Sequence, residues 1–99
     1  MNYLVIGSGR IAQRHIENIK LIDPIAEVFL LTRKKENFKK NNLKANISIK
    51  NVFTDEIEAI KSNPDYVLVC NPSTFHIKTA LFFAKHGIHL FIEKPLSNN

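Results

Sequence analysis

The stretch that decides the fold is the N-terminal segment Tyr3-Leu4-Val5-Ile6-Gly7-Ser8-Gly9-Arg10-Ile11-Ala12. Its apolar run has the length of a strand and ends at a Gly-x-Gly-x-x-Ala turn, where a helical pattern begins. Gly7 permits a tight turn, Gly9 lets a phosphate approach the backbone because no Cβ intervenes, and Ala12 lets the helix pack against its strand. The unpaired N–H groups of the first helical turn would face the anion. This order predicts a site for a dinucleotide pyrophosphate, and an ordinary strand-to-helix turn is the alternative.

Composition and charge limit the classes of protein that this chain can represent. It has 99 residues, enough for one domain, and 44% of them are hydrophobic. Its net charge of +5 favours anionic partners without naming one. No apolar run reaches the roughly 20 residues that span a bilayer, and the N-terminus lacks the order of a signal peptide. The single cysteine excludes an internal disulfide and a cysteine-based metal cluster. We therefore expect a soluble, cytoplasmic protein without a metal site.

Strand and helix patterns alternate along the chain, which predicts an α/β fold with a parallel sheet. The glycine turn and right-handed crossovers favour a Rossmann-type, doubly wound sheet with strand order 3-2-1-4-5, as one dinucleotide-binding domain over residues 1–99. We expect strands over residues 3–6, 27–32, 47–49, 66–70 and 89–92, and helices from 10 to about 22, within 33–46, over 56–61 and from 74 to 86.

Apolar spacing also predicts which helical faces are buried. Ile57 and Ile60 should turn inward from a helix that Thr54 or Asp55 caps. The last helix, capped by Ser73 or Thr74 and ended by Gly87, should bury one stripe of side chains. We expect Phe82 and Phe83 to exceed what that stripe covers and, with the last strand at the edge of the sheet, to promote self-association. The predicted stripe is Ile77, Ala80, Leu81 and Ala84.

Ligands of such sheets bind at the carboxyl ends of the strands where the strand order reverses. Three segments should therefore meet, namely residues 7–10, 70–76 and 93–95. His76, in the first turn of a helix, would contact a cofactor or simply cap or pack. Lys94 could polarise a carbonyl or hold a hydroxyl during hydride transfer, or be an ordinary surface lysine. We interpret Cys70 as a small buried residue rather than a reactive thiol. We interpret His15 as a core histidine with a satisfied hydrogen bond rather than a metal ligand.

The end of the second strand predicts the choice between NAD and NADP. Many NAD sites hold the ribose hydroxyls there with a carboxylate, but Glu27 lies at the wrong end of this strand. Thr32 ends the strand and Arg33 follows it. A 2′-phosphate would meet a cation and no carboxylate, so NADP is favoured over NAD; a solvated basic surface is the alternative. The basic region after this strand, residues 33–50, carries one aromatic ring, Phe38, which argues against a nucleic-acid partner.

Three motifs together resemble the Gfo/Idh/MocA family of NAD(P)-dependent oxidoreductases. They are the segment from Gly7 to Ala12 with His15, the segment Asn71-Pro72-Ser73-Thr74-Phe75-His76, and Gly87-Ile88-His89-Leu90-Phe91-Ile92-Glu93-Lys94-Pro95. The resemblance implies a Rossmann domain of an enzyme that acts on sugars, inositols or nucleotide-linked sugars. It implies a catalytic role for Lys94, and a nicotinamide end shaped by Glu93 and Pro95. The cofactor-binding residues that we predict are Gly7, Ser8, Gly9, Arg10, Ile11, Thr32, Arg33, Cys70, Asn71, Pro72, His76, Glu93 and Lys94.

The chain departs from this family in three respects. Ser73 replaces an asparagine that is frequent there, and Thr32 stands where members that prefer NAD often carry an acidic residue. Family members also continue into a further strand and helix and then a substrate domain. We therefore expect an N-terminal fragment without turnover of its own. A non-catalytic regulatory or redox-sensing nucleotide module is the alternative.

Overall fold

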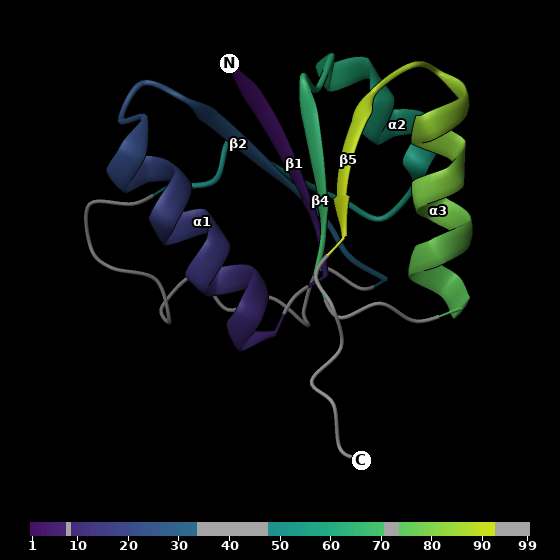
Figure 1. Cartoon of the computed structure of the whole chain (residues 1–99), viewed down its shortest axis with the longest axis horizontal. Helices are drawn as coiled ribbons and strands as arrows, with labels where there is room; N and C mark the ends of the chain where they lie inside the picture. Colours follow the sequence, from purple (N-terminus) through teal and green to yellow (C-terminus); the bar gives the residue numbers. More distant parts are fainter. Residues whose placement is uncertain (8, 34–47, 71–73, 93–99) are drawn as a thin grey trace.

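The computed structural model describes residues 1–7, 9–33, 48–70 and 74–92. Its centre is a parallel sheet with the order β3-β2-β1-β4-β5, which confirms the predicted order (Figure 1). None of the described helices is long and apolar enough to cross a lipid bilayer. The strands are β1 (Asn2–Ile6), β2 (Glu27–Leu31), β3 (Asn51–Phe53), β4 (Tyr66–Val69) and β5 (His89–Ile92), and the helices are α1 (Arg10–Ile22), α2 (Glu56–Ala59), the 3₁₀ turn η3 (Ile60–Ser62) and α3 (Thr74–Lys85).

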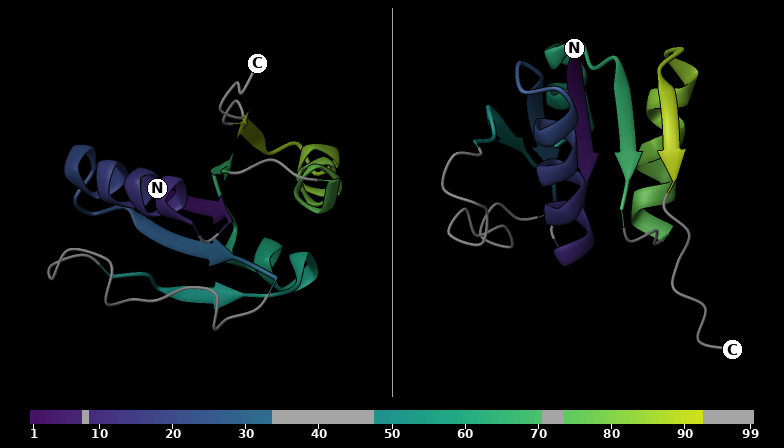
Figure 2. Two further views of the ribbon diagram at one scale, coloured as in Figure 1. Left: turned by 90° about the horizontal axis from the view of Figure 1, so that it is seen from below. Right: turned by 60° about the vertical axis from the view of Figure 1, so that its left-hand side comes forward.

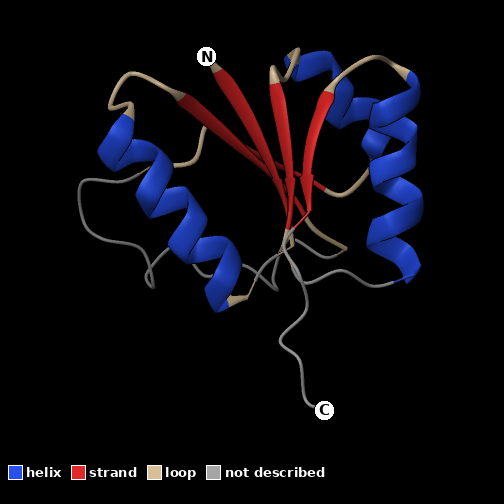
Figure 3. Ribbon diagram, viewed as in Figure 1, coloured by secondary structure: helices blue, strands red, loops and turns tan. Residues whose placement is uncertain are grey.

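Helices cover both faces of this sheet, as its unbroken apolar strands require. Helix α1 packs on one face, over β1 and β2, while α2 and α3 pack on the other (Figures 2 and 3). Strand β1 pairs with β2 on one side and β4 on the other, so Leu4, Val5 and Ile6 are fully buried. Alternate residues of β1 face opposite layers, with Val5 toward α1 and its two neighbours toward α2 and α3.

The third strand begins later than the sequence predicted. We expected it over 47–49, but pairing starts where Asn51 lies opposite Phe29. Ile49 is buried in the α1-side core before the strand begins. Burial of one apolar residue therefore does not mark where backbone pairing starts. Of the segment 33–46, in which a helix is predicted, residues 34–46 lie outside the described residues.

Helix α3 buries a face one residue away from the predicted one. The side chains turned toward the sheet are those of His76, Thr79, Ala80 and Phe83. Of the predicted stripe only Ala80 is buried, whereas Ile77 is 37% and Leu81 54% exposed. Phe83 is fully buried and Phe82 is partly buried, so the expectation that both rings exceed what the buried stripe of this helix needs is wrong for Phe83. The buried set has the same helical spacing as the predicted stripe although it includes the polar His76 and Thr79, and Phe83 is the large side chain that fills the core.

The helix ends agree with the predicted capping, and the structure selects between the two predicted caps of α2, Thr54 and Asp55. The Asp55 carboxylate accepts a hydrogen bond from the backbone N–H of Ile57 at 3.0 Å, so Asp55 caps α2. Ile60 packs against the core as predicted, but Ile57 is 58% exposed, so the prediction that it turns inward is wrong. Gly87 ends α3 with φ +76°, a left-handed conformation that glycine adopts readily. The predicted cap Ser73 lies outside the described residues.

Candidate dinucleotide site at the carboxyl edge of the sheet

The site is the sheet edge where β1 and β4 end side by side and the chain turns away to opposite faces. From β1 the chain enters α1 on one face, and α3 begins at the same edge on the other face (Figures 1 and 2). Strand order reverses between β1 and β4, because β2 lies beyond β1 and β5 beyond β4. At such a reversal, doubly wound sheets bind ligands in a crevice outside the carboxyl ends of the strands.

The glycine turn is held between the ends of β2 and β4. The backbone N–H of Gly7 donates to the carbonyl of Leu31 at 3.0 Å, and that of Cys70 donates to the carbonyl of Ile6 at 2.9 Å. Gly7 has φ +127°, and a Cβ built on it would lie 2.8 Å from the carbonyl oxygen of Cys70. A residue with a side chain could not occupy this position without displacing β4. The turn is therefore shaped by backbone contacts on both sides.

Gly9 differs from Gly7 in having open space where a Cβ would stand. It is the N-cap of α1, with φ −84°, and its carbonyl accepts the backbone N–H of Gln13 at 3.1 Å. Within the described part of the chain, no atom lies within 4 Å of a Cβ built on Gly9. No side chain caps α1 there, so the N–H groups that begin at Arg10 are available to an anion. The vacant space beside Gly9 fits a phosphate approaching the backbone.

The two ends of β2 differ in their charged residues: an arginine follows the carboxyl end, and a carboxylate lies at the other end. At the carboxyl end Thr32 is 3% exposed and donates its backbone N–H to Phe53, whereas Arg33 is exposed. At the other end the Glu27 carboxylate lies 2.6 Å from the Lys50 ammonium. The hydrogen bond from Lys50 and its positive charge lower the pKa of Glu27. Glu27 therefore belongs to an ion pair far along the strand from the crevice, as its sequence position predicted.

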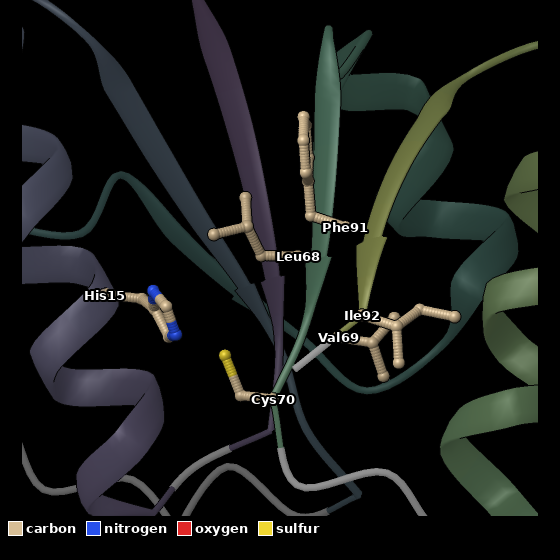
Figure 4. Close-up of a pocket in the computed structure, with 6 residues that line it drawn as sticks. All are labelled: His15, Leu68, Val69, Cys70, Phe91 and Ile92. Atoms are coloured by element: carbon tan, nitrogen blue, oxygen red, sulfur yellow. The ribbon is translucent and has the colours of Figure 1, made fainter. Parts of the chain in front are cut away.

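A hollow of about 320 Å³ lies beside α1, at the ends of β4 and β5. His15 projects into it from α1, and Leu68 and Cys70 from the β4 segment and Phe91 from β5 line it (Figure 4). The Cys70 side chain is buried, as predicted, but His15 is only half-buried and lies at the rim of the core. Sequence reasoning missed His15 as a lining residue. The signal was its place one residue before the fully buried Ile16, which turns it toward the flank of α1.

Of the remaining predicted site residues, the structure describes His76, whereas five others lie outside the described part of the chain. His76 lies in the first turn of α3, on the far face from α1, and is 8% exposed because the protein covers most of its ring. The structure thus brings Gly7, Gly9, Arg10, Ile11 and Cys70 to one corner, with Thr32 and Arg33 at the neighbouring strand end. Outside the described residues lie Ser8, Asn71, Pro72, Glu93 and Lys94.

A parallel sheet of order 3-2-1-4-5 with a glycine turn between β1 and α1 defines a Rossmann-type dinucleotide-binding domain. The chain belongs to the Gfo/Idh/MocA oxidoreductase family, since residues 1–99 match the family model described as "Oxidoreductase family, NAD-binding Rossmann fold". This match confirms the resemblance carried by the three motifs.

Similar proteins include named dehydrogenases. The chain is 36% identical over 96 residues to a myo-inositol 2-dehydrogenase of Thermotoga maritima, which is 96% of this chain and 28% of that protein. It is 28% identical over 100 residues to 4-carboxy-2-hydroxymuconate-6-semialdehyde dehydrogenase of a Sphingobium strain, with 31% of that protein covered. The chain therefore spans about three-tenths of the length of these relatives.

Solved structures share the fold over nearly the same span. A probable dehydrogenase from Thermotoga maritima superposes with a TM-score of 0.75 and 34% identity, over 100% of this chain and 29% of that one. The WlbA dehydrogenase from Bordetella pertussis, determined with NADH and UDP-GlcNAcA, superposes with a TM-score of 0.73 over 100% of this chain and 30% of its own. At 23% identity, the second likeness shows the fold alone.

Proposed function

We propose that residues 1–99 are the cofactor-binding part of a dehydrogenase that transfers hydride between a nicotinamide cofactor and a hydroxyl or carbonyl of a sugar, inositol or nucleotide-linked sugar. The observation that carries this proposal is the paired glycine geometry. Gly7 is locked against Cys70, while Gly9 leaves open space at the start of α1. The named activity of the Thermotoga maritima relative supports an inositol or a related polyol as substrate class.

The residues of this chain would bind and orient the cofactor. The first N–H groups of α1 would hold the pyrophosphate, with Gly7, Ser8, Arg10 and Ile11 forming the surrounding turn. Cys70, Asn71, Pro72 and His76 would border it from the β4 side, and Glu93 would shape its nicotinamide end. The nicotinamide ring supplies or accepts hydride, and Lys94 would orient the reacting oxygen and stabilise its charge.

For the adenosine end we propose a preference for NADP over NAD. Arg33 is exposed immediately after Thr32, where a 2′-phosphate would lie. Glu27, the acidic residue of β2, is at the opposite end and is paired with Lys50. A guanidinium binds a phosphate through charge-assisted hydrogen bonds and would leave the unphosphorylated ribose with fewer contacts.

The test is a thermal-shift titration of the chain with NAD, NADH, NADP and NADPH. A ligand that binds only the folded state raises apparent stability by mass action, so the largest shift identifies the preferred cofactor. We expect the largest shift with the phosphorylated pair. Absence of a shift with any of the four contradicts dinucleotide binding, and a larger shift with NAD contradicts only the cofactor preference.

We further propose that the described fold binds cofactor without turning over substrate, in a cytoplasmic protein that self-associates. Transition-state stabilisation needs groups on the substrate side as well as on the cofactor side. The relatives carry about seven-tenths of their length outside the matched region. Dehydrogenation of myo-inositol or another polyol by the purified 99-residue chain would contradict this proposal.

A further inference from the structure

The carboxyl end of β3 lies beside the carboxyl end of β2, next to the proposed adenosine site. The backbone N–H of Thr32 donates to the carbonyl of Phe53 at 2.9 Å, so the two strands end together. The chain therefore leaves β3 through Thr54 and Asp55 alongside Arg33, which follows β2. Thr54 and Asp55 are both exposed, and Asp55 begins α2 as its N-cap. This strand end thus presents a carboxylate at the same edge of the sheet as the glycine turn.

The Asp55 carboxylate is held in place through one of its two oxygens. Oδ1 accepts a hydrogen bond from the backbone N–H of Ile57 at 3.0 Å. This bond uses only part of the capacity of the group, because an ionised carboxylate has two oxygens that accept hydrogen bonds and no donor. Capping also fixes the direction of the side chain, so Oδ2 is oriented before any ligand arrives. Asp55 is therefore suited to receive a hydrogen bond from a ligand that reaches the end of β3.

A hollow of about 320 Å³ is lined in part by this carboxylate. Its lining in the described chain includes two acidic residues and no lysine, arginine or histidine. The residues that line it are Asn51, Val52, Phe53, Thr54, Asp55 and Glu58. The Glu58 carboxylate pairs with the Lys61 ammonium at 3.0 Å, whereas Asp55 carries its charge at the strand end. Such a lining favours a neutral group that donates hydrogen bonds over a phosphate.

The spacing of the strands matches the order of groups in a dinucleotide. Neighbouring strands lie about 4.8 Å apart, and β1, β2 and β3 follow one another across the sheet. A pyrophosphate at the turn after β1 places the adenosine ribose at the end of β2. The next group along the ligand is the adenine base, and one further strand spacing brings it to the end of β3. Adenine carries an exocyclic amino group that donates hydrogen bonds, which is the chemistry that the end of β3 would accept.

We propose that Asp55 is a specificity-determining residue of the cofactor site, whose carboxylate accepts a hydrogen bond from the amino group of adenine. This inference rests on the proposed dinucleotide site and adds a contact at its adenosine end. Arg33 would act on the 2′-phosphate and Asp55 on the base, so their opposite charges serve different parts of one ligand. Hypoxanthine has a carbonyl oxygen in place of the amino group, which would meet the carboxylate with no proton between them. The chain should therefore discriminate between the two bases.

Calorimetric titration of the chain with NADP and with its hypoxanthine counterpart tests this proposal, and NAD with its own hypoxanthine counterpart repeats the test without the 2′-phosphate. We expect the adenine form of each pair to bind at least about fivefold more tightly. In the variant Asp55→Asn the helix cap is kept, because asparagine caps helices as well as aspartate does. The carboxamide oxygen would retain the bond to Ile57, which places an NH₂ donor where Oδ2 was. We expect the preference for adenine to fall below about twofold, or to reverse, in this variant.

Glu56→Gln is the matched control, because it removes a carboxylate from the same turn and Glu56 is not part of the lining in the described chain. It should keep the wild-type preference, and urea midpoints check that both variants are folded. Equal affinity of the wild type for the two bases, a result that needs no variant, overturns the role of Asp55 and leaves dinucleotide binding in place. A preference retained in Asp55→Asn, or lost equally in Glu56→Gln, overturns it too. If none of the four dinucleotides binds, the proposed function fails and this inference fails with it.

Discussion

Gly7 lies so close to Cys70, at the point where β1 and β4 end, that no side chain fits between them. A Cβ on Gly7 would lie 2.8 Å from the Cys70 carbonyl oxygen and 3.6 Å from the Cys70 Cβ. This close approach fixes the height of the glycine turn relative to β4. It thereby sets where α1 begins, and where its free N–H groups point.

Replacing Gly7 by alanine should destabilise the fold strongly. The new Cβ would clash with a backbone oxygen, and φ +127° is unfavourable for any residue with a side chain. We expect a loss of about 2 to 4 kcal/mol in unfolding free energy, measured by urea denaturation. Gly87→Ala is the matched control, because Gly87 also has positive φ but open space around it, and it should lose only about 1 kcal/mol. Equal losses would show that the clash with Cys70 is unimportant.

Replacing Gly9 by alanine should separate binding from stability. At φ −84° alanine is unstrained, and its Cβ meets no described atom of the protein, so stability should fall by less than about 1 kcal/mol. The same Cβ would occupy the space of the pyrophosphate, and dinucleotide affinity measured by calorimetry should fall at least about tenfold. Asn18→Ala, exposed in the middle of α1, should change neither quantity. Unaltered affinity in Gly9→Ala would place the phosphates elsewhere.

Arg33→Ala should weaken the binding of NADP selectively. Loss of hydrogen bonds to a charged group costs about 1.5 to 3 kcal/mol, so the NADP dissociation constant should rise roughly tenfold or more. NAD lacks the 2′-phosphate, and its dissociation constant should change little. Lys50→Ala serves as a control for net charge, because Lys50 pairs with Glu27 at the other end of β2. An equal loss of NAD and NADP binding in Arg33→Ala would mean that Arg33 contacts a group common to both.

The ion pair of Glu27 with Lys50 predicts a particular pH dependence. Lys50 lowers the pKa of Glu27 below its ordinary value of 4.5, so the folded state binds this proton less readily than the unfolded chain. The pair therefore adds stability above about pH 4.5, and this contribution is lost as the pH falls through the lower, folded-state pKa. The difference in urea midpoint between wild type and Glu27→Gln should shrink over that acidic range. A difference that stays constant with pH would rule out the titration of Glu27 as its source.

The buried face of α3 gives a direct test of packing. Phe83→Ala should cost about 3 to 5 kcal/mol in unfolding free energy, because Phe83 is fully buried between α3 and the sheet. Leu81 is 54% exposed, so Leu81→Ala measured on dilute, monomeric chain should cost less than about 1 kcal/mol. A larger loss in Leu81→Ala than in Phe83→Ala would show that the face of Ile77 and Leu81, which helical spacing predicted, is the buried one.

The glycine turn, the strand order and the family were predictable because their signals are local and specific. Gly7 and Gly9 are required at particular points of one turn, and a nearly unbroken apolar run such as Val28–Leu31 indicates a strand covered on both faces. The alternation of such runs with helices then restricts the topology.

The misses arose where two placements satisfy the same local pattern. In α3, sets of identical spacing begin at His76 and at Ile77. The set at Ile77 is the more apolar one, but packing of Phe83 on the sheet buries the other. In β3, the start of pairing depends on the register with β2, which a short alternating segment does not encode. For His15, the helical pattern indicates the flank of α1 beside Ile16, but that this flank borders the hollow beside Cys70 depends on the position of α1 over β1.

The most direct test of the central claim is an NMR titration of the labelled chain with NADP, followed at backbone amides. A pyrophosphate at the start of α1 predicts that the largest shifts occur at Gly9, Arg10 and Ile11, with a smaller response at Cys70. Unchanged signals there, together with shifts at Asn63, Asp65 and His86 around the hollow at the opposite edge of the sheet, would contradict the assignment of the dinucleotide site.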